Sequence, residues 1–185
     1  MSRPAVFFDR DGVLNPVVMR GDVVASPRRL DEWRLEPQVP ELNAALRAAG
    51  FMTFVITNQP DVARGLMHGD SLDAIHRSLA EAVHLDDIAA CTHDNADHCA
   101  CRKPKPGLVS GLALKHGVDL GASWVIGDQD RDVQTGRAAG VATILLRRPY
   151  NSGSGADHVV ETLSEAVALV LQGARSPLFP SNERV

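Results

Sequence analysis

Apolar positions in this chain follow two patterns, short continuous runs and longer segments with an apolar residue every three or four positions. The continuous runs are typical of buried strands and lie at residues 5–9, 51–57, 88–91, 123–126 and 141–146. The second pattern is typical of helices with one buried face and covers residues 40–49, 71–83, 106–116, 131–139 and 163–171. Five strands that alternate with helices predict an α/β fold, in which helices flank a central parallel sheet.

Local signals set the limits of these elements. Ser71 is expected to cap its helix, whereas Gly117 and Gly140 are expected to end theirs. Residues 16–33 and 148–157 show neither pattern and are predicted loops. Residues 1–172 should form one domain, and residues 173–185 resemble a loose tail.

Composition narrows the class of protein. The chain has 185 residues and a formal net charge of -4, which is the wrong sign for a protein that mainly binds nucleic acid. Its start lacks the apolar region of a secretory signal, and no run approaches the roughly 18 apolar residues that cross a bilayer. We therefore expect a cytoplasmic monomer that binds neither membrane nor nucleic acid and acts on a small molecule.

Polar residues follow four of the predicted strands. Asp9 and Asp11 come after the first strand, and the pairs after the next three are Thr57 and Asn58, Arg102 and Lys103, and Asp128 and Asp132. Because parallel strands end at one edge of their sheet, these side chains should gather there. Carboxylates, a hydroxyl and a lysine together suit the binding of a hard cation and a phosphate.

The order and strand context of these motifs resemble the haloacid dehalogenase superfamily of phosphohydrolases. The motifs are Asp-x-Asp-Gly from Asp9, Thr-Asn at Thr57, the lysine at Lys103 and Gly-Asp-x-x-x-Asp from Gly127. The resemblance covers residues 5–146 and implies a Rossmann-like sheet. It also implies an aspartyl-phosphate mechanism, with Asp9 as the nucleophile and Asp11 as the general acid and then the general base.

Magnesium is the cation that this chemistry implies. We expect the carboxyl groups of Asp9, Asp11 and Asp128 to gather around one Mg²⁺, and the family implies that Asp11 binds it through its backbone carbonyl. Asp132 is expected either to reach the cation through water or to orient Lys103. Lys103 would neutralise charge that develops on the transferred phosphoryl group.

Further residues are expected to bind the substrate. Thr57 and Asn58 are expected to hold phosphate oxygens, and Gln59 and Arg64 complete the expected binding set. Arg102 is placed to meet a distal anionic group, a task that suits its planar guanidinium.

A short segment gathers all three cysteines of the chain. Cys91, His93, Cys99 and Cys101 match a closed tetrahedral zinc site, which would be structural because it leaves no open position. His98 is a rival to His93, although its place directly before Cys99 makes joint ligation awkward. The alternative is three reduced cysteines in an ordinary loop.

This zinc loop, residues 91–101, narrows the resemblance. It is similar to the loops of D-glycero-D-manno-heptose 1,7-bisphosphate phosphatases and histidinol-phosphate phosphatases, which lack a large cap domain. The run from Lys103 to Leu108 favours the heptose enzymes, whereas Pro60 and Asp61 stand where that family often has Ser-Gly. The resemblance implies removal of the 7-phosphate of the bisphosphate. Alternatives are histidinol phosphate or another small sugar phosphate, a phosphotransferase, or a non-catalytic zinc-clipped interaction module.

The remaining aromatic side chains carry no clear chemistry. Trp33 and Trp124 are expected to pack in the core. Most of the other histidines are expected to be solvated or to cap helices: His68, His76, His84, His116 and His158.

Overall fold

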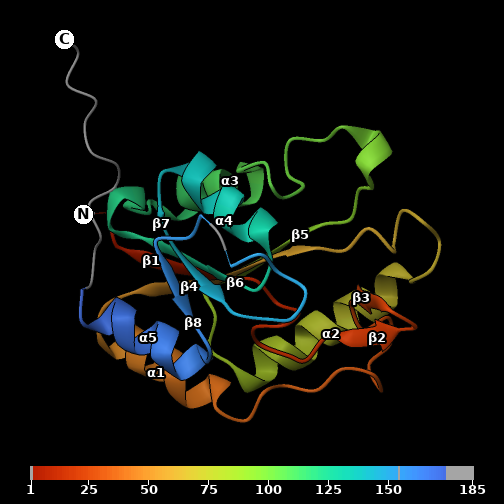
Figure 1. Cartoon of the computed structure of the whole chain (residues 1–185), viewed down its shortest axis with the longest axis horizontal. Coiled ribbons are helices and arrows are strands. Elements are labelled where there is room, and N and C mark those ends of the chain that lie inside the picture. The colour runs from red at the N-terminus through yellow and green to blue at the C-terminus, as the bar shows by residue number, and fades with distance from the viewer. Residues whose placement is uncertain (1, 154, 174–185) are drawn as a thin grey trace.

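The computed structural model describes residues 2–153 and 155–173; the predicted tail beyond Gly173 lies outside this range. Six parallel strands form one sheet in the order β5-β4-β1-β6-β7-β8 (Figure 1). Their bounds are β1 Ala5–Phe8, β4 Met52–Asn58, β5 Asp87–Cys91, β6 Trp124–Gly127, β7 Ala142–Leu146 and β8 His158–Val160. A separate antiparallel hairpin consists of β2 Val18–Arg20 and β3 Val23–Ala25.

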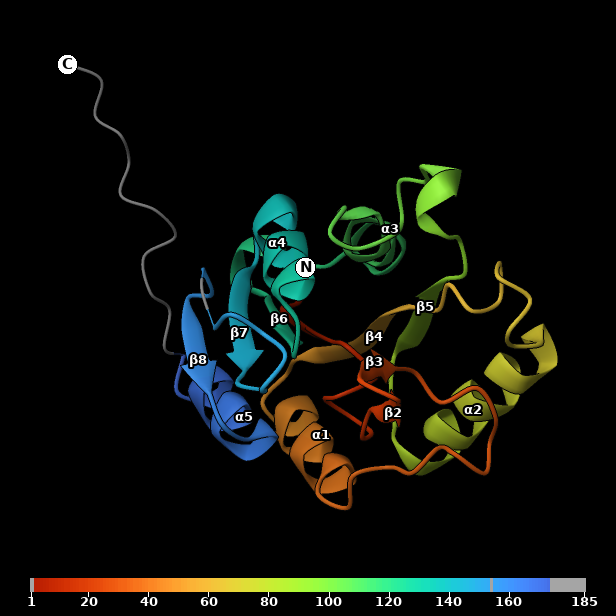
Figure 2. The same cartoon turned by 45° about the vertical axis from the view of Figure 1, so that its right-hand side comes forward.

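Helices cover both faces of the sheet. Figures 1 and 2 show α3 and α4 on one face and α1 and α5 on the other. The helices are α1 Val39–Ala48, α2 Gly69–Ala82, α3 Gly107–His116, α4 Asp130–Ala139 and α5 Leu163–Leu171. The predicted α/β class is thus confirmed, and no cap domain interrupts the described part of the chain.

Alternation along β1 divides the core into two layers. Ala5 and Phe7 pack with α3 on one face, whereas Val6 and Phe8 pack with α1, α2 and α5 on the other. This follows from the twofold period of strand side chains. Trp33 and Trp124 are buried in the second layer, as predicted.

The structure corrects the sequence prediction at short elements. β8 and the β2–β3 hairpin are strands of three residues each, too short to show a period. Ser71 does not cap α2, because that helix begins two residues earlier at Gly69. Short strands depend on neighbours that are distant in sequence, so the local pattern did not predict them.

The connections of the sheet position its functional edge. From β1 the chain first moves to one side through β4 and β5, then crosses to the other side of β1 through β6 and β7. Ligands of open α/β sheets bind beyond the carboxyl ends of the strands at such a reversal. Here that point lies between β1 and β6, which end immediately before Asp9 and Asp128. Among the described residues, no helix is long and apolar enough to cross a membrane.

Candidate active site

A buried group of three carboxylates lies at this reversal point. One oxygen from each of Asp9, Asp128 and Asp132 lies within 4.8 Å of the others. Lys103 Nζ is 2.9 Å from Asp9 Oδ1 and 2.6 Å from Asp132 Oδ1, and it also donates to the carbonyl of Ile56 at 3.1 Å. Two ion pairs and one hydrogen bond thus surround the buried ammonium group. Asp132 was expected either to reach the cation through water or to orient Lys103. Its ion pair with Lys103 agrees with the second role.

The electrostatics of this group favour a divalent cation. When all three carboxylates are ionised, Lys103 neutralises only one of their charges. Burial is the main cause that raises the pKa of Asp9 to about 6 and that of Asp128 to about 8, and in both cases neighbouring carboxylates add to it. Asp128 Oδ1 is buried and accepts no hydrogen bond from the described residues. An all-oxygen donor set with excess negative charge fits Mg²⁺.

The carboxylate of Asp11 lies outside this group, contrary to the expected trio of Asp9, Asp11 and Asp128. Arg10, which is fully buried, binds it through two hydrogen bonds of 3.0 and 3.1 Å, and Asn15 Nδ2 donates to it at 2.9 Å. Burial alone would raise the pKa of Asp11, but the charge and hydrogen bonds of Arg10 outweigh burial and lower it. The free protein therefore holds Asp11 as an ionised carboxylate.

His76 was expected to be solvated or to cap a helix, but it is half-buried and contacts the arginine of this ion pair. Its Nε2 lies 3.1 Å from Arg10 Nη1, so the neutral ring can accept a hydrogen bond from the guanidinium. Burial first, and the positive charge of Arg10 second, lower the pKa of His76 to about 4.

This shift predicts a dependence of stability on pH. Because unfolding restores a pKa near 6.5, the contribution of His76 is complete above that pH and is lost as the pH falls towards 4. Between pH 7 and 4.5 we expect wild type to lose about 2 to 3 kcal/mol more unfolding free energy than His76→Gln. Urea unfolding of both proteins at several pH values measures this difference, and parallel curves would contradict it.

The last residues of β4 and the residue that follows it connect the parts of the site. Gln59, fully buried, donates from Nε2 to Asp11 Oδ2 at 2.8 Å and to Thr57 Oγ1 at 2.7 Å. Asn58 exchanges two hydrogen bonds of 3.0 and 3.1 Å with the backbone of Lys103. Both amides were expected to bind substrate, and both line the pocket, where their side chains also hydrogen-bond within the site.

A pocket opens above these residues, and five arginines line it: Arg20, Arg28, Arg64, Arg102 and Arg131. The β2–β3 hairpin contributes to one wall. Three of the arginines already pair with carboxylates, Arg20 with Glu32, Arg28 with Asp61, and Arg64 with Asp61 and Asp94. Arg102 instead donates to Asn95 Oδ1 and to the His93 carbonyl, and it forms no salt bridge with the other described residues.

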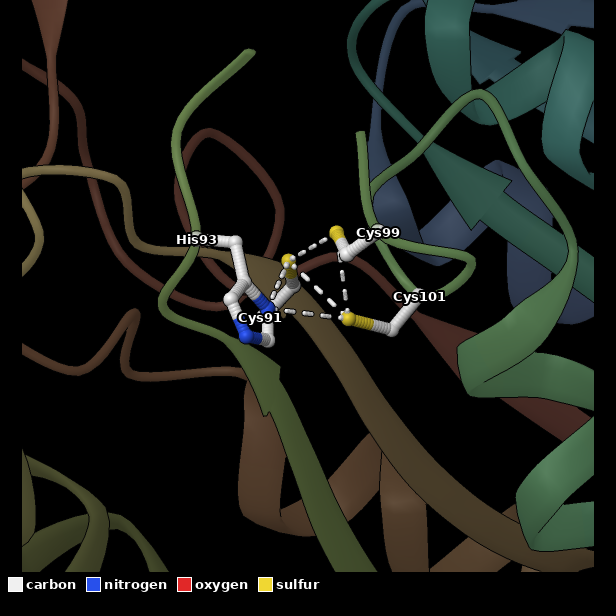
Figure 3. Close-up of side chains that lie close together, drawn as sticks. All are labelled: Cys91, His93, Cys99 and Cys101. Carbon is white, nitrogen blue, oxygen red and sulfur yellow. Dashed lines mark hydrogen bonds between the residues drawn. The ribbon is translucent and has the colours of Figure 1, made fainter. Parts of the chain in front are cut away.

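The predicted sulfur cluster forms at the end of β5. Figure 3 shows Cys91, His93, Cys99 and Cys101 pointing towards one another, at distances of 3.2 to 3.6 Å between ligand atoms. Zinc–sulfur bonds of about 2.3 Å in a tetrahedron place sulfurs roughly 3.8 Å apart, so the spacing fits a metal. His98 is not a member of this group.

The loop that carries this cysteine cluster, residues 91–101, is joined to the pocket at several points. Arg64 makes two hydrogen bonds of 2.8 and 2.7 Å to Asp94, and Arg102 bonds to the neighbouring Asn95. The backbone N–H of Gln59 donates to the carbonyl of Cys91 at 2.7 Å. The conformation of this loop therefore affects residues that line the pocket.

Some contributors to the site were not predicted from the sequence. Arg10 stands between two acidic residues at a strand end, a pattern that could have suggested an ion pair. Asn15 lies three residues after the end of that motif. Tyr150, which contacts Asp128, lies in a Gly/Ser-rich segment 22 residues further on, and no local pattern indicates it.

Comparison with known proteins agrees with this architecture. Residues 100–172 match the HAD-hydrolase-like family model. The chain is 37% identical over 152 residues to a D-glycero-β-D-manno-heptose-1,7-bisphosphate 7-phosphatase of Pseudomonas aeruginosa, across 80% of this chain and 83% of that protein. The chain belongs to the heptose-bisphosphate phosphatase family. The predicted superfamily is thus confirmed, together with its phosphatase character.

Other members of the heptose-bisphosphate phosphatase family are similarly close. A relative from Rhodopseudomonas palustris with the same name is 38% identical over 154 residues, which cover 75% of this chain and 81% of that one. The crystal structure of the D,D-heptose 1,7-bisphosphate phosphatase of Bordetella bronchiseptica, complexed with magnesium and phosphate, aligns with a TM-score of 0.77 at 34% identity. The alignment of the two structures covers 91% of this chain and 98% of the Bordetella bronchiseptica chain.

Proposed function

We propose that this protein is a Mg²⁺-dependent phosphatase that removes the 7-phosphate of D-glycero-D-manno-heptose 1,7-bisphosphate. The observation that carries the proposal is the buried group of Asp9, Asp128 and Asp132 around Lys103, which reaches an arginine-lined pocket through Asp9 and Lys103. The names of its relatives support the substrate.

In the first step, a carboxylate oxygen of Asp9 attacks phosphorus. A new P–O bond forms to Asp9 while the ester P–O bond breaks, and Asp11 gives a proton to the leaving sugar oxygen. Asp11 must first take up that proton, because Arg10 keeps it ionised in the free protein. The negative phosphate of an arriving substrate raises the pKa of a nearby carboxylate and so favours this uptake.

In the second step, Asp11, now ionised again, takes a proton from water. The water oxygen attacks the phosphorus of the aspartyl-phosphate, the P–O bond to Asp9 breaks, and inorganic phosphate leaves. Arg10, Asn15 and Gln59 hold the Asp11 carboxylate in its ionised state. An ionised Asp11 carboxylate held in this way can accept the proton of the attacking water.

The other residues of the cluster hold the phosphoryl group and the cation. Asp9 and Asp128 would bind Mg²⁺ with the backbone carbonyl of Asp11, and the ion would neutralise charge on the transferred group. Thr57 would donate to a phosphate oxygen, with Gln59 fixing its hydroxyl. Asn58 would act through its hold on Lys103.

The distal phosphate of the substrate would bind at Arg102, with Arg64 beside it in the pocket. Arg102 suits this role because it hydrogen-bonds to the neutral Asn95 side chain and the His93 carbonyl, and among the described residues it forms no salt bridge. A planar guanidinium binds phosphate through paired hydrogen bonds.

The cysteine cluster would hold a structural Zn²⁺ through Cys91, His93, Cys99 and Cys101. Four protein ligands leave no open position for chemistry. The three cysteines are free thiols, and reduced thiols are typical of cytoplasmic proteins, so a cytoplasmic location is part of the proposal. We include in the proposal that residues 1–172 act as a single domain and as a monomer.

A substrate panel tests the proposed function. We expect heptose 1,7-bisphosphate to release one phosphate and leave the 1-phosphate, as phosphorus NMR would show. The rate of phosphate release from each anomer of the bisphosphate should be compared with the rates from histidinol phosphate and other sugar monophosphates at equal concentration. Faster turnover of histidinol phosphate would reassign the substrate, and no release from any compound would favour a non-catalytic role.

A further inference from the structure

The loop after β7 folds back over the carboxylate cluster. Tyr150 donates a hydrogen bond from its hydroxyl to Asp128 Oδ2. Asn151 Nδ2 anchors the loop with bonds of 2.8 Å to the carbonyls of Asp128 and Leu146. Arg148 Nη2 lies 3.2 Å from the carbonyl of Gly12. The loop thus contacts the segments after both β1 and β6.

The two oxygens of Asp128 have different surroundings. Oδ2 accepts the hydrogen bond of Tyr150, whereas Oδ1 is buried and accepts none from the described residues. Gly12 has a φ of +85°, and a Cβ at that position would lie 2.0 Å from Asp128 Oδ2 and 3.0 Å from the Tyr150 hydroxyl. Close packing against this glycine and the tyrosine hydroxyl together hold the carboxylate in one orientation.

We propose that Tyr150 is a positioning residue for the metal centre, whose hydroxyl holds Oδ2 of Asp128 so that Oδ1 faces the divalent cation. This inference rests on the Mg²⁺ site of the proposed function. Partners of ligand carboxylates orient them and tune metal affinity.

The replacement Tyr150→Phe removes only the hydroxyl. Tyr150 is 36% exposed, so the substitution should leave the core intact. We expect the variant to bind Mn²⁺ and Mg²⁺ about tenfold more weakly or worse. The Mg²⁺ concentration that gives half-maximal activity should rise by a similar factor.

Metal binding is best measured without substrate. Mn²⁺ titration followed by electron paramagnetic resonance, on protein with its cysteine cluster filled with zinc, gives the Kd directly, and competition gives the value for Mg²⁺. Arg147→Gln is the matched control, because it changes the same loop at an exposed ion pair with Glu161. It should bind Mn²⁺ like wild type.

Two outcomes would overturn the positioning role. A Kd for Tyr150→Phe within twofold of wild type would show that the hydroxyl does not matter, and tighter binding would show that it competes with the cation for Asp128. Asp128→Asn separates this question from the proposed function. If that variant binds Mn²⁺ like wild type, the metal site itself is wrong, whatever Tyr150 does.

Discussion

Asp9→Asn is expected to reduce phosphate release from the bisphosphate by at least about 10⁴-fold, because an amide cannot form the aspartyl-phosphate. The substitution keeps the size of the side chain and leaves Lys103 paired with Asp132. Fold and zinc content should therefore stay unchanged. Steady-state phosphate release, circular dichroism and metal analysis measure the three quantities.

Asp70→Asn provides the matched control, because Asp70 is exposed on α2 and does not line the pocket. It should keep wild-type turnover. If Asp9→Asn also retained turnover within tenfold of wild type, another group would have to be the nucleophile.

Cys101→Ser is expected to release the zinc and to lower the free energy of unfolding by several kcal/mol. Structural zinc binds with apparent free energies of about 10 to 16 kcal/mol in small peptides, and part of that stabilises the fold. The KM for the bisphosphate should also rise, because the loop holds Arg64 and Arg102. Metal analysis, urea unfolding and initial rates test these effects.

His98→Asn distinguishes the ligands of this cluster. His98 lies in the same loop but outside the group of four, so its replacement should leave zinc content and stability unchanged. Loss of zinc in this variant would return His98 to the ligand set. Loss of zinc from Cys101→Ser with unchanged stability would contradict a structural role for the metal.

The sequence predicted the sheet and the members of the site better than it predicted their contacts. Strand runs such as residues 141–146 are buried on both faces, so composition alone indicates them, and the order of motifs then places Asp9 and Asp128 at one edge. Which way each polar side chain turns depends on partners that are distant in the chain. Gln59 faces Asp11 across 48 positions, and no local pattern encodes that contact.

The errors have the same cause. Asp11 follows Asp9 by two residues, which suggested that their carboxylates share a face, but the intervening Arg10 is buried and turns Asp11 towards itself. A fully buried arginine requires an anionic partner, and Asp11 lies within reach. His76 looked solvated for a similar reason, since only the fold brings α2 against that guanidinium.

The β2–β3 hairpin bears on how this phosphatase could diversify. It helps to line the pocket, yet it pairs only with itself and shares no strand with the six-stranded sheet. Changes in its sequence can reshape the entrance for a different sugar while the catalytic edge between β1 and β6 keeps its geometry. New specificities could thus arise in this ribbon without loss of the underlying chemistry.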